Sequence, residues 1–240
     1  MAKKIVIASG KGGVGKSTTA AGLYRAFSAK GLKVLAVDAD IGLRSLDIIL
    51  GLQDSVAFDW GDVLLGRCEP RAAMVPDGAS ALLPAPLALN RAFTYQAFRR
   101  LIAFLEPGFD YIITDAPAGV AKGYHLAACA SDTAIIVSTP DEICVRSAAA
   151  AAAGLEAFHL QDIRLVINRI GKKRVTAGKM LNIDEVIDMT GIRLIGVVPE
   201  DPDAALCTVK GIPIPVTSPA AMAFADIAER LEGGNVPLKL

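Results

Sequence analysis

A segment near the N-terminus has the residue types and the spacing that a phosphate-binding loop needs. Residues 10–17 read Gly-Lys-Gly-Gly-Val-Gly-Lys-Ser, which matches the pattern G-x-x-x-x-G-K-S. Glycines let the backbone turn and bring its N–H groups against phosphate oxygens, and the helix that follows offers its positive end to an anion. We expect Lys16 to reach the β- and γ-phosphates and the Ser17 hydroxyl to ligate Mg²⁺. The loop therefore predicts a site for ATP with Mg²⁺.

The same loop carries a second lysine, Lys11, at a position where the pattern tolerates almost any residue. A cation there is suited to stabilise charge on the γ-phosphate of its own subunit or of a facing one. A solvated surface lysine is the alternative, and the loop residues by themselves favour neither. The loop residues predicted to surround the nucleotide are Gly10, Lys11, Gly12, Gly13, Val14, Gly15, Lys16, Ser17 and Thr18.

Three aspartates stand at the ends of apolar runs of strand length. Asp38 and Asp40 follow one such run, and Asp115 follows another. The carboxyl ends of parallel strands meet at the ligand-binding edge of an open α/β sheet, so we expect Asp38 and Asp115 to join Ser17 in organising Mg²⁺. Helix capping by Asp38 or Asp40 is the alternative. The small, turn-prone segment 117–119 is suited to sense the γ-phosphate through its backbone N–H groups.

These residues need a sheet whose strands end side by side. Short apolar runs alternate along the chain with amphipathic segments of helix length. We expect strands at 3–8, 33–37, 111–114, 133–137, 163–167 and 194–198, and helices at 16–30, 91–106, 141–159 and 218–232. The alternation and the loop predict an α/β fold, namely a three-layer P-loop NTPase with a mostly parallel twisted sheet and helices on both faces.

The chain is expected to form a single P-loop ATPase domain over 1–240, with a short C-terminal tail at 233–240. The stretch 76–90 is rich in turn residues, and we interpret it as a surface excursion within that domain. A hydrophobic content of 52% suits a sizeable buried core.

Composition excludes several classes of function. Lys and Arg number 25 and Asp and Glu number 25, so no global charge draws the chain towards nucleic acid or an anionic membrane. Four scattered cysteines and two histidines do not make a zinc set. With neither a secretory signal nor a long apolar run in the sequence, we expect a cytoplasmic protein.

Three segments resemble one known family. The loop with its neighbours, residues 9–19, is similar to the deviant Walker A motif of the MinD/ParA family, and the segments 37–47 and 109–119 resemble that family's switch I and switch II. The resemblance covers nearly the whole chain. It implies that Lys11 crosses a nucleotide-sandwich dimer, that Asp40 positions the attacking water, and that Asp38 supports the metal region. Lys11, Lys16 and Asp40 are thus the expected catalytic residues.

The resemblance also implies where adenine lies. In MinD-like proteins the ends of two late strands hold the base, which here correspond to Asn168, Arg169, Pro199, Glu200 and Asp201. An Asn side chain both donates to and accepts from adenine, although an ordinary turn asparagine fits the sequence equally well.

The implied function is a Mg²⁺-dependent ATPase that ATP switches into a homodimer, in cell-division site selection or intracellular positioning. A ParA-like DNA or cargo partition ATPase and a regulatory module that holds nucleotide with little turnover are the alternatives. Balanced charge gives no support to nucleic-acid binding.

Two departures from MinD members of the family bear on partners. Such members usually end in a basic amphipathic helix, which the tail 233–240 does not resemble. Either that helix is missing from this sequence, or the chain does not bind membrane by itself and is placed peripherally at the inner membrane only through a partner. Alanines after Ser147 replace the family's acidic residues, which leaves a protein partner of the MinC or MinE type open.

Overall fold

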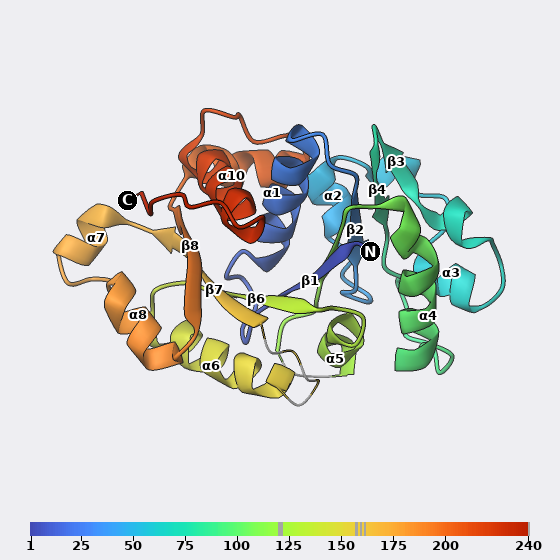
Figure 1. The fold of residues 1–240 in the computed structure, drawn as a ribbon, viewed down its shortest axis with the longest axis horizontal. Helices are drawn as coiled ribbons and strands as arrows, with labels where there is room; N and C mark the ends of the chain where they lie inside the picture. The colour runs from blue at the N-terminus through green and yellow to red at the C-terminus, as the bar shows by residue number, and fades with distance from the viewer. Residues whose placement is uncertain (120–121, 157, 159, 161, 240) are drawn as a thin grey trace.

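Within the part of the chain that the structure describes, eight strands form one sheet through the middle of the molecule (Figure 1). The computed structural model describes residues 1–119, 122–156, 158, 160 and 162–239. The strand order is β3-β4-β2-β5-β1-β6-β7-β8, and all neighbours pair in parallel except β3 and β4. The strands are β1 (Lys3–Ala8), β2 (Val34–Asp38), β3 (Val75–Asp77), β4 (Ser80–Leu83), β5 (Tyr111–Asp115), β6 (Thr133–Ser138), β7 (Asp162–Ile170) and β8 (Arg193–Pro199).

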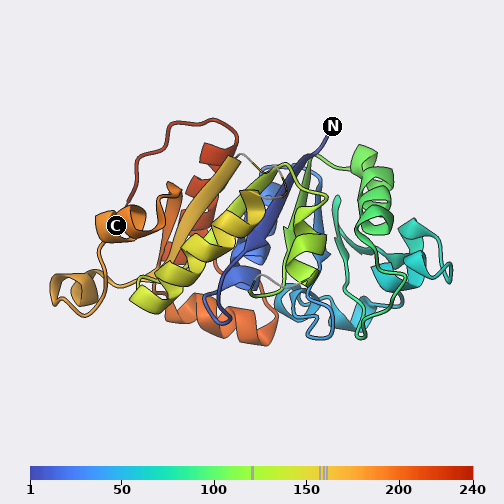
Figure 2. The same cartoon turned by 90° about the horizontal axis from the view of Figure 1, so that it is seen from below.

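Helices cover both faces of the sheet (Figures 1 and 2). One face carries α1 (Lys16–Ala29), α2 (Leu46–Leu50), α9 (Pro202–Lys210) and α10 (Pro219–Leu231). The other carries α3 (Trp60–Leu64), α4 (Tyr95–Leu105), α5 (Lys122–Ala128), α6 (Glu142–Glu156) and α8 (Ile183–Thr190). The remaining helical segments are α7 (Lys172–Thr176) at one end of the molecule and the short 3₁₀ turns Gln53–Ser55, Pro70–Ala73 and Glu106–Gly108.

Successive side chains of a strand point to opposite sides of the sheet. Because helices cover both sides, both sets of side chains in the central strands are buried. In β1, Ile5 and Ile7 pack into the core under α1, whereas Val6 and Ala8 pack into the core under α6. This is why β1, β2 and β5 are continuous apolar runs and not alternating ones.

The fold confirms the expected three-layer α/β architecture. Each of the six expected strands is present, with ends shifted by up to three residues, and the four expected helices correspond to α1, α4, α6 and α10. The expected end of the 141–159 helix falls partly outside the described residues. The sheet also brings the carboxyl ends of β1, β2 and β5 together, since Ile7 and Asp38 both lie opposite Asp115.

The interpretation of 76–90 as a surface excursion is wrong. Its residues 80–83 form β4, which is buried and pairs in parallel with β2. The preceding strand, β3, pairs antiparallel with the other edge of β4. A strand of four residues between Gly78 and Pro84 has too little length for a pattern of its own. Its place is fixed by pairing with β2, which the local sequence does not encode.

Candidate nucleotide-binding site

The loop between β1 and α1 needs glycine at several positions. Gly13 and Gly15 adopt φ angles of 82° and 92°, in the left-handed region that other residues rarely enter. A Cβ on Gly10 would lie 1.9 Å from the backbone oxygen of Ser147 in α6, and one on Gly15 would lie 2.1 Å from Nδ2 of Asn168. The loop is therefore wedged between α6 and the end of β7.

Lys16 and Asp115 meet at the floor of this loop. Lys16 Nζ lies 2.7 Å from Asp115 Oδ1 and 3.3 Å from the Ser17 hydroxyl, and both charged side chains are buried. Asp115 Oδ2 is buried without a hydrogen-bond partner. Burial raises the pKa of Asp115, and the Lys16 ammonium opposes that rise. A carboxylate with one unsatisfied oxygen beside a hydroxyl is suited to a hard cation or to its water shell.

Asp38 ends β2 directly opposite Asp115 in the sheet register. Its Oδ1 accepts a hydrogen bond from the backbone N–H of Asp40 and its Oδ2 accepts one from Leu46, each at 2.9 Å. Trp60 Nε1 donates to the Asp38 carbonyl oxygen at 2.8 Å. Burial first, and then the nearby Asp115 carboxylate, raise the pKa of Asp38. Asp38 thus shapes the loop that leads to α2 in addition to placing charge near the floor.

Asp40 is the outer member of the acidic pair. It is half-buried, and that partial burial raises the pKa of its carboxyl group. The backbone that follows is held in an unusual shape, because Arg44 has a φ of 40° and its side chain pairs with Asp47 at 2.7 Å. Ser45 in the same segment lies 3.3 Å from Ser17, hydroxyl to hydroxyl, which ties the segment to the phosphate loop.

Lys11 lies at the exposed rim of the loop. Ser9 Oγ donates to the Lys11 carbonyl oxygen at 3.0 Å, and the N–H of Gly119 donates to the Ser9 carbonyl oxygen at 3.0 Å. The segment 117–119 is therefore bonded to the loop, and the N–H of Gly119 is used in that bond. Against the effect of burial, hydrogen bonds from Thr139 and from the backbone N–H of Cys144 hold the pKa of Asp141 below its usual value, and the Lys11 charge adds a smaller effect in the same direction.

The residues expected around adenine end neighbouring strands, β7 and β8. Asn168 donates through Nδ2 to the Val14 carbonyl oxygen at 2.8 Å, and its Oδ1 accepts from the backbone N–H of Arg169, whose φ is 57°. Pro199 is half-buried and Glu200 is exposed, with Glu200 3.8 Å from Arg174.

Asp201 accepts bonds from the N–H groups of Asp203 and Ala204 and therefore caps α9. Ser218 also donates to it. Its carboxylate contributes to local structure, which the sequence pattern did not predict.

The donor set fits Mg²⁺ better than a transition metal. Among the described residues there is no group of three His, Cys, Asp or Glu side chains that would enclose a metal. Mg²⁺ is usually held by one or two carboxylates together with substrate phosphates and several waters. Ser17, Asp115 and Asp38 at the floor supply that kind of partial set.

Comparison with known proteins decides the family. The profile of the CobQ/CobB/MinD/ParA nucleotide binding domain matches residues 5–214. The septum site-determining protein MinD of Synechocystis sp. is 38% identical over 244 residues, covering 99% of this chain and 92% of the relative. The chain belongs to the MinD family of P-loop ATPases. Its relatives from Bacillus subtilis and Synechocystis are both named for septum site determination.

Solved structures agree with this MinD-family assignment. The chain superposes with a TM-score of 0.92 on a chain of the MinC:MinD cell division protein complex of Aquifex aeolicus, at 37% identity over 100% of this chain and 99% of that one. The septum site-determining protein MinD of Pyrococcus horikoshii, complexed with Mg-ADP, gives 0.86 at 29% identity over 97% and 96%. None of the described helices is long and apolar enough to cross a bilayer.

Three contributors to the site were missed by sequence reasoning. Trp60 braces the end of β2, Ser45 joins Ser17, and the Ser147 backbone presses on the loop. Trp60 is the single tryptophan and follows Asp59, the N-cap residue of α3. The aspartate predicts that a helix starts there, but it does not predict which group the Trp60 side chain contacts. These contacts join segments far apart in the chain, and no local pattern encodes them.

Proposed function

We propose that this chain is a Mg²⁺-dependent ATPase that ATP drives into a homodimer, and that it acts in septum site selection. The observation that carries the proposal is the contrast between two lysines of one loop. Lys16 is 7% exposed and already paired at the floor, whereas Lys11 is exposed at the rim. A loop that served a single subunit would need only the first.

Each subunit would hold its own nucleotide through the loop floor. Lys16 would move from Asp115 to the β- and γ-phosphates, which present more negative charge than one carboxylate. Ser17 and Asp115 would ligate Mg²⁺ directly or through water, with Asp38 supporting the metal region. Bound Mg²⁺ neutralises phosphate charge. Gly10 to Thr18 would surround the phosphates, and the base would lie among Asn168, Arg169, Pro199, Glu200 and Asp201.

Asp40 is the residue proposed to orient the attacking water. It is half-buried beside the floor, whereas both oxygens of Asp38 already accept backbone N–H groups. The water oxygen would bond to the γ-phosphorus as the bond to the ADP oxygen breaks, and the water would release its proton to a phosphate oxygen or to solvent. Such transfer depends on positioning and charge stabilisation more than on a strong base. Lys11 of the facing subunit would add positive charge at the γ-phosphate.

The partner that fits the comparison is a protein of the MinC type. A relative with a TM-score of 0.92 was solved in the MinC:MinD cell division protein complex of Aquifex aeolicus, and this chain covers 99% of it. The ATP-bound dimer is the form expected to offer the partner surface, because both subunits then contribute to one face.

The mass of the protein in solution tests the switch. We expect a dimer with Mg²⁺ and a non-hydrolysable ATP analogue, and a monomer with ADP or without nucleotide. Lys11→Ala should bind the analogue within about threefold of wild type, because Lys16 and the loop N–H groups remain, yet stay monomeric. The matched control is Lys172→Ala on α7, which also removes an exposed lysine and should dimerise normally. A monomer in all three nucleotide states, with nucleotide binding intact, would contradict the switch.

A further inference from the structure

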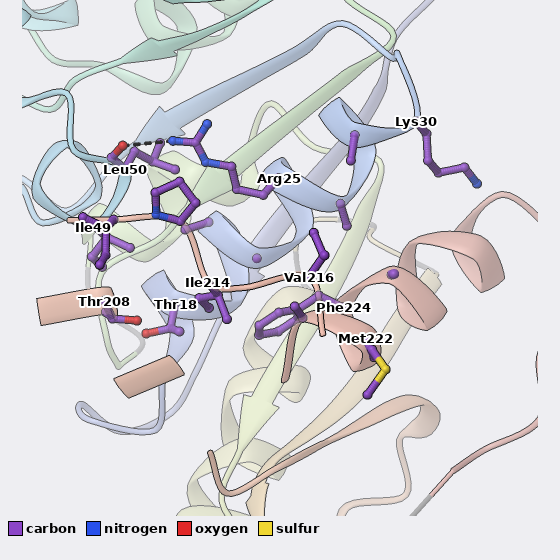
Figure 3. A pocket seen from close by; sticks show the side chains of 18 of the residues that line it. Thr18, Arg25, Lys30, Ile49, Leu50, Thr208, Ile214, Val216, Met222 and Phe224 are labelled. Atoms are coloured by element: carbon purple, nitrogen blue, oxygen red, sulfur yellow. Dashed lines mark hydrogen bonds between the residues drawn. The ribbon is translucent and has the colours of Figure 1, made fainter. Parts of the chain in front are cut away.

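A pocket of about 530 Å³ lies beside α1, on the face that α1 shares with α10 (Figure 3). Its walls come from α1, from α10 and from the loop between α9 and α10, and Ile49 and Leu50 of α2 close one side. Small-molecule sites typically enclose roughly 300–1,000 Å³. Of the residues assigned to the nucleotide site, only Thr18 is among the described residues that line this pocket.

The lining is mostly hydrocarbon. The α1 wall consists largely of small residues such as Ala21 and Ala26, which leave room, and Phe224 and Met222 face it from α10. A Cβ on Gly22 would lie 2.3 Å from the Phe224 ring, so α1 and α10 are in close contact at that position. The connecting loop contributes Ile212, Pro213, Ile214 and Val216. Burial of apolar ligand surface is therefore the main favourable term this pocket offers.

The charged groups at the pocket already have partners. Arg25 binds Asp77 at 2.7 Å and donates to the Leu50 carbonyl oxygen at 3.0 Å (Figure 3 shows the second bond). Lys30 pairs with Glu229 at 2.5 Å and with Glu232. An anionic ligand would have to break one of these pairs and would meet the acidic residues around them. The pairing favours an uncharged ligand.

Two hydroxyl groups provide the uncharged polar contacts among the described lining residues, Thr18 and Thr208. Thr208 Oγ1 donates to the Ala204 carbonyl oxygen at 2.8 Å, which leaves its lone pairs to accept. We propose that this pocket binds a neutral, mostly hydrocarbon small molecule with one hydroxyl or carbonyl oxygen near Thr18 and Thr208. Because Thr18 is in the first turn of α1, the ligand contacts the helix that carries Lys16 and Ser17.

The uncharged fluorophore N-phenyl-1-naphthylamine tests the site directly, with the full chain and no nucleotide. We expect saturable fluorescence enhancement with one probe per chain. Ala26→Phe fills the pocket from α1 and Ala221→Phe fills it from α10, and each should weaken probe binding by at least roughly tenfold. Ala103→Phe adds the same ring at an exposed position of α4 outside the pocket and should leave probe affinity unchanged. Unaltered binding of a fluorescent ADP to each variant shows that it is folded.

Several results would overturn this assignment. Probe fluorescence that does not saturate, or that both filling variants leave unchanged, means that the pocket does not take such a ligand. A probe that Mg-ADP displaces and that both filling variants still bind with unchanged affinity would lie in the nucleotide site. A change of solution mass in Ala26→Phe and Ala221→Phe without a change in probe binding would indicate that a protein surface covers this face. None of these readouts depends on ATP turnover, so they are separate from the test of the switch.

Discussion

The floor of the phosphate loop and its rim differ in how their charges are balanced. At the floor, Lys16 and Asp115 are buried and 2.7 Å apart, and both oxygens of Asp38 accept backbone N–H groups. At the rim, Lys11 is exposed and Asp40 is half-buried. A buried ion pair is costly to form and more costly to leave half-made, so Lys16 stays paired with Asp115 until a nucleotide offers it a stronger partner. Because Lys11 and Asp40 are less buried than the floor residues, their side chains are accessible to a nucleotide or to a second subunit.

Lys16→Ala should have the largest effect, because it removes the cation at the floor. A hydrogen bond to a charged group contributes about 1.5–3 kcal/mol, so ADP affinity should fall by roughly 10–100-fold and turnover should be lost. Equilibrium titration with fluorescent ADP at fixed Mg²⁺ measures this. Lys11→Ala is the matched control from the rim and should bind ADP as wild type does. Equal loss of affinity in the two variants would erase the distinction between floor and rim.

Asp40→Ala should separate chemistry from binding. We expect ATP hydrolysis to fall by roughly 100-fold, since positioned proton acceptors contribute about 10²–10⁴-fold, while ATP affinity and the ATP-dependent dimer are retained. Phosphate release under ATP saturation and mass in ATP are the two measurements. The control is Asp54→Ala, which removes a carboxylate from the 3₁₀ turn Gln53–Ser55 and should hydrolyse ATP at the wild-type rate. Normal turnover in Asp40→Ala would remove this residue from the site.

Much of the floor could be predicted from sequence. Asp38 and Asp115 each end an apolar run, and parallel strands bring such ends to one edge, so their proximity follows from the fold class. The Lys16–Asp115 bond does not follow, because it joins residues 99 apart whose distance depends on strand order. Nor does the use of Asp38 as an anchor for Leu46, which requires the actual path of the loop.

The expected adenine site and the edge of the sheet were harder to predict from the sequence. Asn168 was expected at adenine, and in this structure its amide bonds the Val14 carbonyl beneath the loop. A single asparagine at a strand end is equally suited to both roles, so sequence could not decide. The sequence also did not predict the strand β4. Four buried residues are too few to show a periodic pattern of hydrophobicity, and their pairing with β2 depends on the tertiary structure.

Gly10→Ala and Gly12→Ala compare a crowded position of the phosphate loop with an open position of the same loop. A Cβ on Gly10 would overlap the Ser147 backbone at 1.9 Å, so either α6 or the loop must move, whereas a Cβ on Gly12 meets its nearest atom at 3.9 Å. Overpacking typically costs about 1–3 kcal/mol, and we expect Gly10→Ala to lose that much stability in urea unfolding without nucleotide. Gly12→Ala should stay within about 0.5 kcal/mol of wild type. Equal stability of the two would mean that α6 does not press on the loop.

The smallest expected effect is the pH dependence of stability, which comes from the buried aspartates at the floor of the loop. Burial raises the pKa of both Asp38 and Asp115 above the unfolded value of about 3.9, so the folded chain holds protons that the unfolded chain has released. The stability that these two carboxyl groups contribute without nucleotide is therefore greatest below that value and falls as pH rises towards the folded pKa values. The pKa values of Asp141 and Asp201 are lowered, so their contribution to stability is lost only as pH falls below the unfolded value. Each 1 kcal/mol lost corresponds to roughly 2–4 °C of Tm in a protein of about this size.

Mg-ADP should act in the opposite direction, because a divalent cation favours the ionised carboxylates. We expect the Tm without nucleotide to fall from pH 5 to pH 8, and the increase in Tm on adding Mg-ADP to be larger at pH 8. Thermal unfolding across that range measures both, and ADP with a chelator is the control, since it leaves the carboxylates without a cation. A Tm that stays constant or rises from pH 5 to pH 8 in the absence of nucleotide would contradict this prediction. It would mean that the buried aspartates are already ionised in the folded chain at pH 5 and take up no protons on folding.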